Sequence, residues 1–177
     1  MLFSRTDIPG VLLISLEPAI DERGAFARCF CKQEFERQSL RTHVIQCNVS
    51  FNKKKGTLRG MHYQIAPHAE AKMVRCTRGA VYDVALDLRL DSPTFRKWEF
   101  FELTPDNGAM LYIPEGVAHG FQTLKDNSEV FYHMFSAYEP SYARGVRWDD
   151  ALFGIKWPEI GLRIISDRDQ NYPDFKV

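Results

Sequence analysis

Strict alternation of side-chain character over residues 80–90 is the feature that most constrains the fold of this chain. Every second position from Ala80 to Leu90 is apolar or aromatic, whereas the positions between them include Asp83, Asp87 and Arg89. Successive side chains of a β-strand point to opposite faces, so this segment is predicted to be a strand with one apolar and one carboxylate-bearing face. The apolar face is expected to pack as core, and the other face to line a polar cavity.

Short apolar segments separated by Gly, Pro and polar residues continue along the chain. Residues 57–64 are expected to form a strand with Gly60 at its centre, and further strands are expected at 11–16, 25–31, 44–50, 72–77, 98–103, 109–113, 120–124 and 129–138. Helical character is expected only at 32–40 and, with Asp149 as N-cap, at 149–153. Many short strands with turns between them predict a sandwich, barrel or jelly roll. No repeat or linker interrupts the 177 residues, so one domain spanning 1–177 is predicted.

Charge and composition exclude several functional classes. The chain has 23 Lys and Arg against 23 Asp and Glu, a formal net charge of zero. Nonspecific binding to nucleic acid or to membranes requires a basic excess, so neither partner is expected. No apolar stretch approaches the ~20 residues of a membrane span. Four irregularly spaced cysteines do not make a disulfide framework. These features together predict a cytoplasmic protein.

Two histidines stand out by their local sequence. His62 follows Gly60, and a glycine within a strand is typical of a site where a ligand or another backbone approaches closely. Arg59 and His62 have opposite parity, so a bulge at Gly60 is needed for both to face one cavity. His119 follows a tight turn, which suits a position at a barrel mouth and equally a core position. Surface positions are expected for the remaining histidines, His43, His68 and His133.

The Pro114-x-Gly116-x-x-His119 arrangement resembles the second motif of the cupin superfamily. Metal-binding cupins carry a His-x-His pair and a downstream Glu in the first motif, but here His62 is followed by Gln64, with no Glu at the matching distance. Two imidazoles are too few for a catalytic metal site. The resemblance therefore implies a cupin without a metal or other cofactor, and a metal-dependent cupin enzyme is kept as an alternative.

A closer resemblance covers nearly the whole chain, from about residue 9 to residue 169. Six stretches carry it: DERGAF (21–26), LRGMHYQ (58–64), KMVRCTRGAVYDVALDLR (72–89), SPTF (92–95), IPEGVAHGF (113–121) and WDDALFGIKWP (148–158). In this order they resemble the dTDP-4-dehydrorhamnose 3,5-epimerase family. The resemblance implies a mainly β, cupin-type double-stranded β-helix (jelly roll) with a few short helices. It also implies a homodimer that exchanges N-terminal strands, and a nucleoside-diphosphate sugar as the substrate.

The resemblance assigns four catalytic roles. His62 matches the general base and Asp169 the carboxylate that pairs with it, with Asp167 as a nearby rival. Lys72 matches the cation beside the keto oxygen, and Tyr132 the acid on the other face of the sugar ring. These residue types suit epimerisation next to a ketone. The C4 ketone acidifies hydrogens at C3 and C5, a histidine with a pKa of ~6.5 can accept a proton, and a cation can stabilise the enolate.

The same resemblance implies a set of substrate-binding residues: Arg23, Phe26, Gln46, Asn48, Arg59, His119 and Tyr138. The forked donors of Arg23 and Arg59 match the oxygens of a diphosphate. The sequence departs from the family pattern at Arg28, Cys47 and Ala143, where acidic residues are common. We therefore hypothesise altered recognition of the nucleotide or the sugar. Two alternatives stay open, a single-centre (C3 or C5) epimerase and a non-catalytic nucleotide-sugar-binding cupin.

Overall fold

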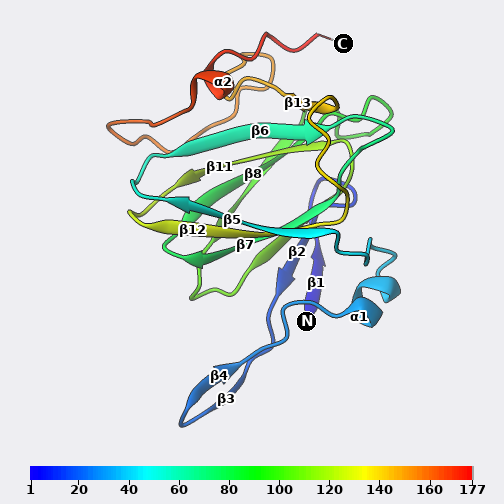
Figure 1. The fold of residues 1–177 in the computed structure, drawn as a ribbon, viewed down its shortest axis with the longest axis vertical. Helices are drawn as coiled ribbons and strands as arrows, with labels where there is room; N and C mark the ends of the chain where they lie inside the picture. The colour runs from blue at the N-terminus through cyan, green and yellow to red at the C-terminus, as the bar shows by residue number, and fades with distance from the viewer. Residues whose placement is uncertain (177) are drawn as a thin grey trace.

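The computed structural model describes residues 1–176, and residue 177, the last of the predicted domain, lies outside the described residues. Two antiparallel sheets face each other (Figure 1). The six-stranded sheet has the order β1 (Leu2–Arg5), β2 (Leu12–Ser15), β10 (Met110–Ile113), β7 (Lys72–Arg78), β12 (Ser128–Met134), β5 (Gln46–Asn52). The five-stranded sheet has the order β13 (Ala143–Gly145), β6 (Leu58–Gln64), β11 (Val117–Thr123), β8 (Val81–Asp87), β9 (Trp98–Leu103). The predicted mainly β, cupin-like fold is confirmed.

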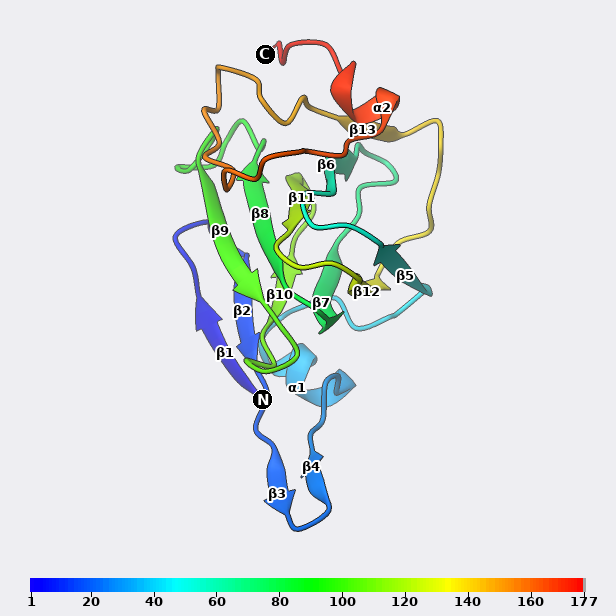
Figure 2. The same cartoon turned by 90° about the vertical axis from the view of Figure 1, so that its left-hand side faces the viewer.

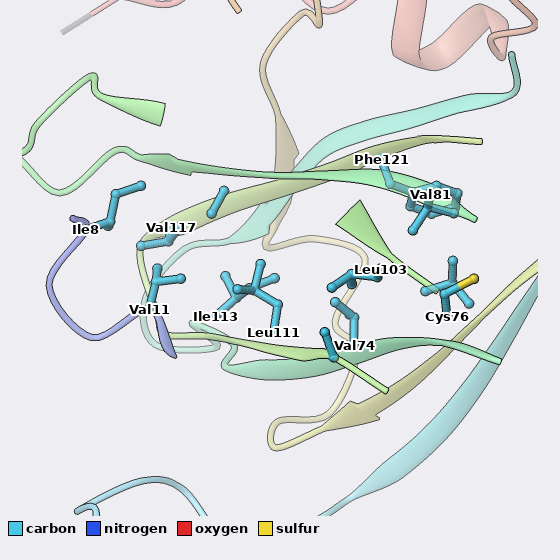
Figure 3. Packing of buried hydrophobic residues seen from close by; sticks show 13 residues of the cluster. Ile8, Val11, Val74, Cys76, Val81, Leu103, Leu111, Ile113, Val117 and Phe121 are labelled. Atoms are coloured by element: carbon cyan, nitrogen blue, oxygen red, sulfur yellow. The ribbon is translucent and has the colours of Figure 1, made fainter. Parts of the chain in front are cut away.

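Apolar side chains from both sheets meet between them and form the main core (Figure 3). Val74 and Leu111 contribute from the six-stranded sheet, and Val81 and Phe121 from the five-stranded sheet, all at most 1% exposed. The outer face of β8 is also buried, because the C-terminal segment lies across it and packs Trp157 there. Both faces of β8 are therefore covered, and its alternation separates two apolar clusters.

A two-stranded hairpin projects from the body of the molecule (Figure 2). It consists of β3 (Ala19–Asp21) and β4 (Gly24–Phe26). Ile20 is 77% exposed and Phe26 80% exposed, so the hairpin has no core of its own. The strand predicted at 25–31 was wrong beyond Phe26, since the chain leaves the hairpin there and continues without regular structure to α1.

Two short helices are present among the described residues. Helix α1 (Lys32–Arg37) buries Phe35 and ends earlier than predicted, and α2 (Asp167–Gln170) was not predicted. The helix predicted at 149–153 was wrong. Consecutive turns form there because the Asp150 carboxylate accepts hydrogen bonds from the backbone N–H groups of Leu152 and Phe175, at 2.9 and 2.8 Å. None of the described helices has the length and apolar character needed to cross a membrane.

Two of the three histidines expected at the surface are partly buried. His43 is exposed as predicted, but His68 packs against Tyr142 and His133 stacks on Phe30 with a ring-centroid distance of 5.8 Å. The burial of His133 comes from a tertiary contact. The segment between the hairpin and α1 lies over the outer face of β12 and covers His133.

Candidate active site

A cavity of about 330 Å³ lies between the two sheets, beside the main core. Strands β6 and β11 supply one wall, and β5, β7 and β12 supply the other. The sequence-predicted residues that line it are His62, Lys72, Tyr132, Asn48, Arg59, His119 and Tyr138. The jelly roll thus fills part of its interior with core and leaves the rest as a polar pocket.

A bulge at Gly60 brings Arg59 and His62 to the same cavity. On the neighbouring strand β11, His119 is opposite His62 and Phe121 is opposite Arg59, so β6 has one extra residue in this interval. Gly60 has φ of +123°, and a Cβ placed there would lie 2.5 Å from the Cα of Gly120. The close approach of two backbones therefore requires glycine, and the expected bulge is present.

His62 and Asp169 form a hydrogen-bonded pair. Nε2 of His62 lies 2.7 Å from Oδ1 of Asp169, and the backbone N–H of Gly60 donates to Oδ2 at 3.1 Å. Helix α2 positions this carboxylate, since Ser166 caps the helix and accepts from the Asp169 N–H. Burial acts to raise the pKa of Asp169, but the bonds from His62 and Gly60 outweigh it and hold the pKa below its ordinary value. The rival Asp167 is exposed.

Lys72 faces His62 from the opposite sheet and is paired with a carboxylate that the sequence reasoning missed. Its Nζ lies 2.5 Å from Oε1 of Glu70, and the two side chains are 5% and 7% exposed. The spacing of two residues places both on one side of an extended segment. That spacing was the signal that could have identified Glu70.

Tyr132 lies on β12, in the same sheet as Lys72 and across the cavity from His62. Burial raises its pKa far above the ordinary value, the charges of Asp83 and Glu70 add to the shift, and Arg59 opposes it. The phenol therefore stays protonated over the physiological pH range. It can donate a proton into the cavity.

His119 pairs with Asp83 on the neighbouring strand β8. Its Nε2 lies 2.9 and 3.0 Å from the two carboxylate oxygens of Asp83, which is fully buried. Burial raises the pKa of Asp83 despite the opposing effects of His119 and Lys72. Asp83 was not singled out from the sequence, although it lies on the carboxylate-bearing face of the strand that was expected to line a cavity.

Three predicted binding residues do not line this chain's own cavity. Arg23 and Phe26 lie on the projecting hairpin, where Arg23 forms an ion pair with Asp21. Gln46, two residues before Asn48 on β5, donates a hydrogen bond of 3.1 Å to the Oδ1 of Asn48.

The rim of the cavity is positively charged. Arg144 and Arg168 line it together with Arg59, and the sequence reasoning had identified only Arg59. The Nε of Arg59 donates to Asn52 at 2.8 Å, which fixes the orientation of the guanidinium. Three arginines around one opening suit an anionic ligand such as a diphosphate.

The three positions that depart from the family pattern lie in different environments. Ala143 lines the cavity, Cys47 is exposed, and Arg28 forms an ion pair of 2.9 Å with Glu34 of α1. In a single chain, only Ala143 is placed to affect a bound ligand directly.

The arrangement of these groups fits proton transfer at a carbon next to a carbonyl group. A carboxylate-paired imidazole lies on one sheet, and a neutral phenol with a buried ammonium lies on the other. A base and an acid on opposite sides of a bound molecule can remove a proton from one face and supply one to the other. The ammonium can stabilise the negative charge that forms in between.

Comparisons with known proteins agree over almost the full chain. The family model described as dTDP-4-dehydrorhamnose 3,5-epimerase matches residues 5–177. A dTDP-4-dehydrorhamnose 3,5-epimerase of Sinorhizobium fredii is 40% identical over 98% of this chain and 89% of its own length. The crystal structure of the enzyme of that name from Elizabethkingia anophelis has a TM-score of 0.95 and 36% identity, covering 99% of this chain and 96% of its own. ChmJ, a 3′-monoepimerase from Streptomyces bikiniensis in complex with dTDP-quinovose, has a TM-score of 0.89 and 32% identity, covering 95% and 85%.

Proposed function

The chain belongs to the dTDP-4-dehydrorhamnose 3,5-epimerase family, and we propose that it inverts C3 and C5 of a nucleoside-diphosphate-linked 4-keto-6-deoxy sugar. It is an isomerase of the sugar-nucleotide epimerase class. The observation that carries the mechanism is the placement of His62 and Tyr132 on opposite sheets around one cavity that also holds Lys72.

His62 removes the proton. With its Nε2–H donating to Asp169, the lone pair of Nδ1 is free to accept a proton from the carbon next to the ketone. The electron pair of the broken C–H bond moves onto the C4 oxygen and forms an enolate. Asp169 fixes the tautomer of the imidazole and stabilises the imidazolium that results.

Lys72 and Tyr132 complete the inversion. The buried ammonium of Lys72 is placed to hold the enolate oxygen. Tyr132 then donates its phenolic proton to the same carbon from the opposite face, and the electron pair returns from the oxygen to that carbon. The new C–H bond has the inverted configuration, and the reaction uses no redox step.

The hairpin that carries Arg23 and Phe26 supports a second part of the proposal, a homodimer. Both residues are expected to bind substrate, yet they project from the body of their own chain with exposed side chains. In a dimer that exchanges N-terminal strands, the hairpin of each subunit would reach its partner's cavity. The guanidinium of Arg23 would then join Arg59 at the diphosphate.

The hypothesis of altered nucleotide or sugar recognition stays a prediction. It now rests mainly on Ala143, since Arg28 and Cys47 do not line this chain's cavity. A panel of thymidine, cytidine, guanosine and uridine diphosphate sugars tests it. A clear preference for the thymidine sugar would reject the hypothesis and leave the family's substrate class unchanged.

Incubation with dTDP-4-keto-6-deoxyglucose, followed by NMR of the product, tests the proposed function. Inversion at both C3 and C5 is expected, with no product from the His62→Ala variant. Inversion at C3 alone would favour the single-centre alternative. ChmJ, to which this chain is similar, is such an enzyme, a 3′-monoepimerase. Binding of the sugar nucleotide without any conversion would favour the non-catalytic alternative.

A further inference from the structure

Glu70 and Lys72 form a buried ion pair, of which the proposed mechanism uses only the Lys72 ammonium. The Glu70 carboxylate has no role in that mechanism. The Oε1 of Glu70 lies 2.5 Å from the Nζ of Lys72, and both side chains are less than a tenth exposed. Both residues line the cavity. Burying a carboxylate beside a site where negative charge must develop is unfavourable unless that carboxylate has a further partner.

Each member of the pair has hydrogen-bonding capacity left over. Within residues 1–176, the only buried side-chain polar atoms without a partner are Nδ1 of His133 and the hydroxyl of Tyr172. The second carboxylate oxygen of Glu70 has no hydrogen bond among these residues and is not one of those two buried atoms, so it keeps some exposed surface. Because Glu70 lines the cavity, we expect this surface to face the cavity. Lys72 has three N–H donors and uses one for Glu70. A free acceptor therefore lies directly beside free donors.

This pair matches one edge of the sugar. A ketone accepts hydrogen bonds, and the hydroxyl on the neighbouring carbon donates one. We propose that Glu70 is a specificity residue, an inference that rests on the proposed function. Its carboxylate accepts a hydrogen bond from the C3 hydroxyl of the sugar while Lys72 holds the C4 oxygen. The substrate class is thereby narrowed to 4-keto sugars that carry a hydroxyl at C3.

Two further observations support this placement. Glu70 adds to the raised pKa of Tyr132, so its carboxylate lies near the acid as well as near the cation. Lys72 and Tyr132 act on the ketone and on its neighbouring carbons, so the part of the sugar around C4 is expected to lie beside these same groups.

The experiment compares dTDP-4-keto-6-deoxyglucose with its 3-deoxy analogue in D₂O. Deuterium is read at C5 only, because loss of the hydroxyl also changes the acidity of the C3 hydrogen. A hydrogen bond to a charged group gives roughly 10- to 100-fold discrimination, so kcat/KM for the deoxy sugar is expected to fall by about that factor. In the Glu70→Gln variant the discrimination is expected to shrink to a few-fold.

The matched control is Glu129→Gln. Glu129 accepts a hydrogen bond of 2.7 Å from Thr77 and does not line the cavity, so this variant should keep the wild-type discrimination. Thermal unfolding checks that the Glu70→Gln protein is folded. If it is not, the double variant Glu70→Gln/Lys72→Met, which leaves no unpaired buried charge, is compared by calorimetric binding of the two sugars.

Equal C5 exchange of the two sugars by the wild-type protein would overturn the inference. So would discrimination that persists undiminished in the folded Glu70→Gln protein, or in calorimetric binding by the double variant. Absence of exchange with either sugar would overturn the proposed function, and the inference with it. The two failures are therefore distinguishable.

Discussion

Tyr132 and Asp169 lie in the same site, and their surroundings shift their pKa values in opposite directions. Burial and the charges of Asp83 and Glu70 raise the pKa of Tyr132, whereas hydrogen bonds from His62 and Gly60 overcome burial and lower that of Asp169. At neutral pH the phenol is therefore protonated and the carboxylate ionised. Each group is held in the form that its role requires.

Separating the two proton transfers gives a prediction for the Tyr132→Phe variant. His62 remains able to remove a proton and return a solvent-derived one to the same face, so deuterium should still enter the sugar without inversion. The rate of epimerisation should fall by about 10²–10⁴-fold. NMR of the product in D₂O measures both quantities.

The His62→Ala variant is the matched comparison, and it should lose both the exchange and the inversion. Inversion at the wild-type rate by Tyr132→Phe would show that another group supplies the second proton.

At the scale of the elements, the close approach of the neighbouring strands β6 and β11 at Gly60 determines the geometry of the site. A Cβ at Gly60 would meet Gly120 and the carbonyl oxygen of His119 at 2.5 and 2.8 Å, and the φ of +123° is unfavourable for any other residue. Gly60→Ala should therefore cost more than about 2 kcal/mol of unfolding free energy and abolish activity by moving His62.

Urea unfolding and the epimerase assay test this prediction against a control at Gly161. A Cβ at Gly161 meets nothing within 4 Å, so Gly161→Ala should change the unfolding free energy by less than about 0.5 kcal/mol. An active, stable Gly60→Ala protein would contradict this account of the bulge.

The end of β8 gives a prediction about acid stability. Asp87 accepts hydrogen bonds from Arg89, Ser92 and Thr94, and these outweigh its burial and hold its pKa at about 2, below the ordinary 3.8. Because the folded-state pKa is the lower one, the stabilisation is present above pH ~4 and is lost as the pH falls towards 2. Its size is on the order of 1–2 kcal/mol, since the partly exposed Arg89 is screened by solvent.

Urea unfolding of Asp87→Asn at several pH values measures this contribution. The difference in unfolding free energy from the wild-type protein should be largest above pH ~4 and should narrow as the pH falls towards 2. The exposed Asp91→Asn serves as the control. A difference that does not change with pH would mean that the Asp87 carboxylate is not the group responsible.

Elements with strong local patterns were predictable from the sequence, and elements held by distant contacts were not. The alternation at 80–90 predicted β8. The opposite parity of Arg59 and His62 indicated that a bulge was needed for both to face one cavity. Both inferences follow from the two-residue period of a strand. The four-residue helix α2 has too little local pattern to be recognised, and its Asp169 is held by Gly60 and His62, more than a hundred positions away.

The residues of the site divide in the same way, into those with a local sequence signal and those held by distant contacts. The family resemblance identified seven of the residues that line the cavity, but not Glu70 and Asp83, the partners that hold Lys72 and His119. Pairing across strands depends on register, which no short motif encodes. The hairpin that carries Arg23 and Phe26 is the extreme case, since its expected contacts lie outside its own chain.

For the whole molecule, the projecting hairpin gives a prediction about subunit complementation. One variant lacks residues 19–26, and the other carries His62→Ala with an intact hairpin. Each alone should be inactive or nearly so. In a statistical mixture of refolded dimers, half are mixed, and one of their two sites has both a hairpin and His62, so about a quarter of wild-type activity should return.

Activity measured as a function of the mixing ratio tests the exchange. The control mixes His62→Ala with Tyr132→Phe, which affect the same cavity but not the hairpin. No recovery in the hairpin mixture, beside dimers shown by sedimentation, would contradict the exchange.

The most direct test of the central claim is a count of the deuterons that enter the sugar. The protein, treated with a chelator, is incubated in D₂O with dTDP-4-keto-6-deoxyglucose, and mass spectrometry with NMR assigns the label. We predict deuterium at both C3 and C5, absent with His62→Ala. No deuterium at either carbon, although the sugar nucleotide binds, would contradict the assignment of this cavity as an epimerase active site.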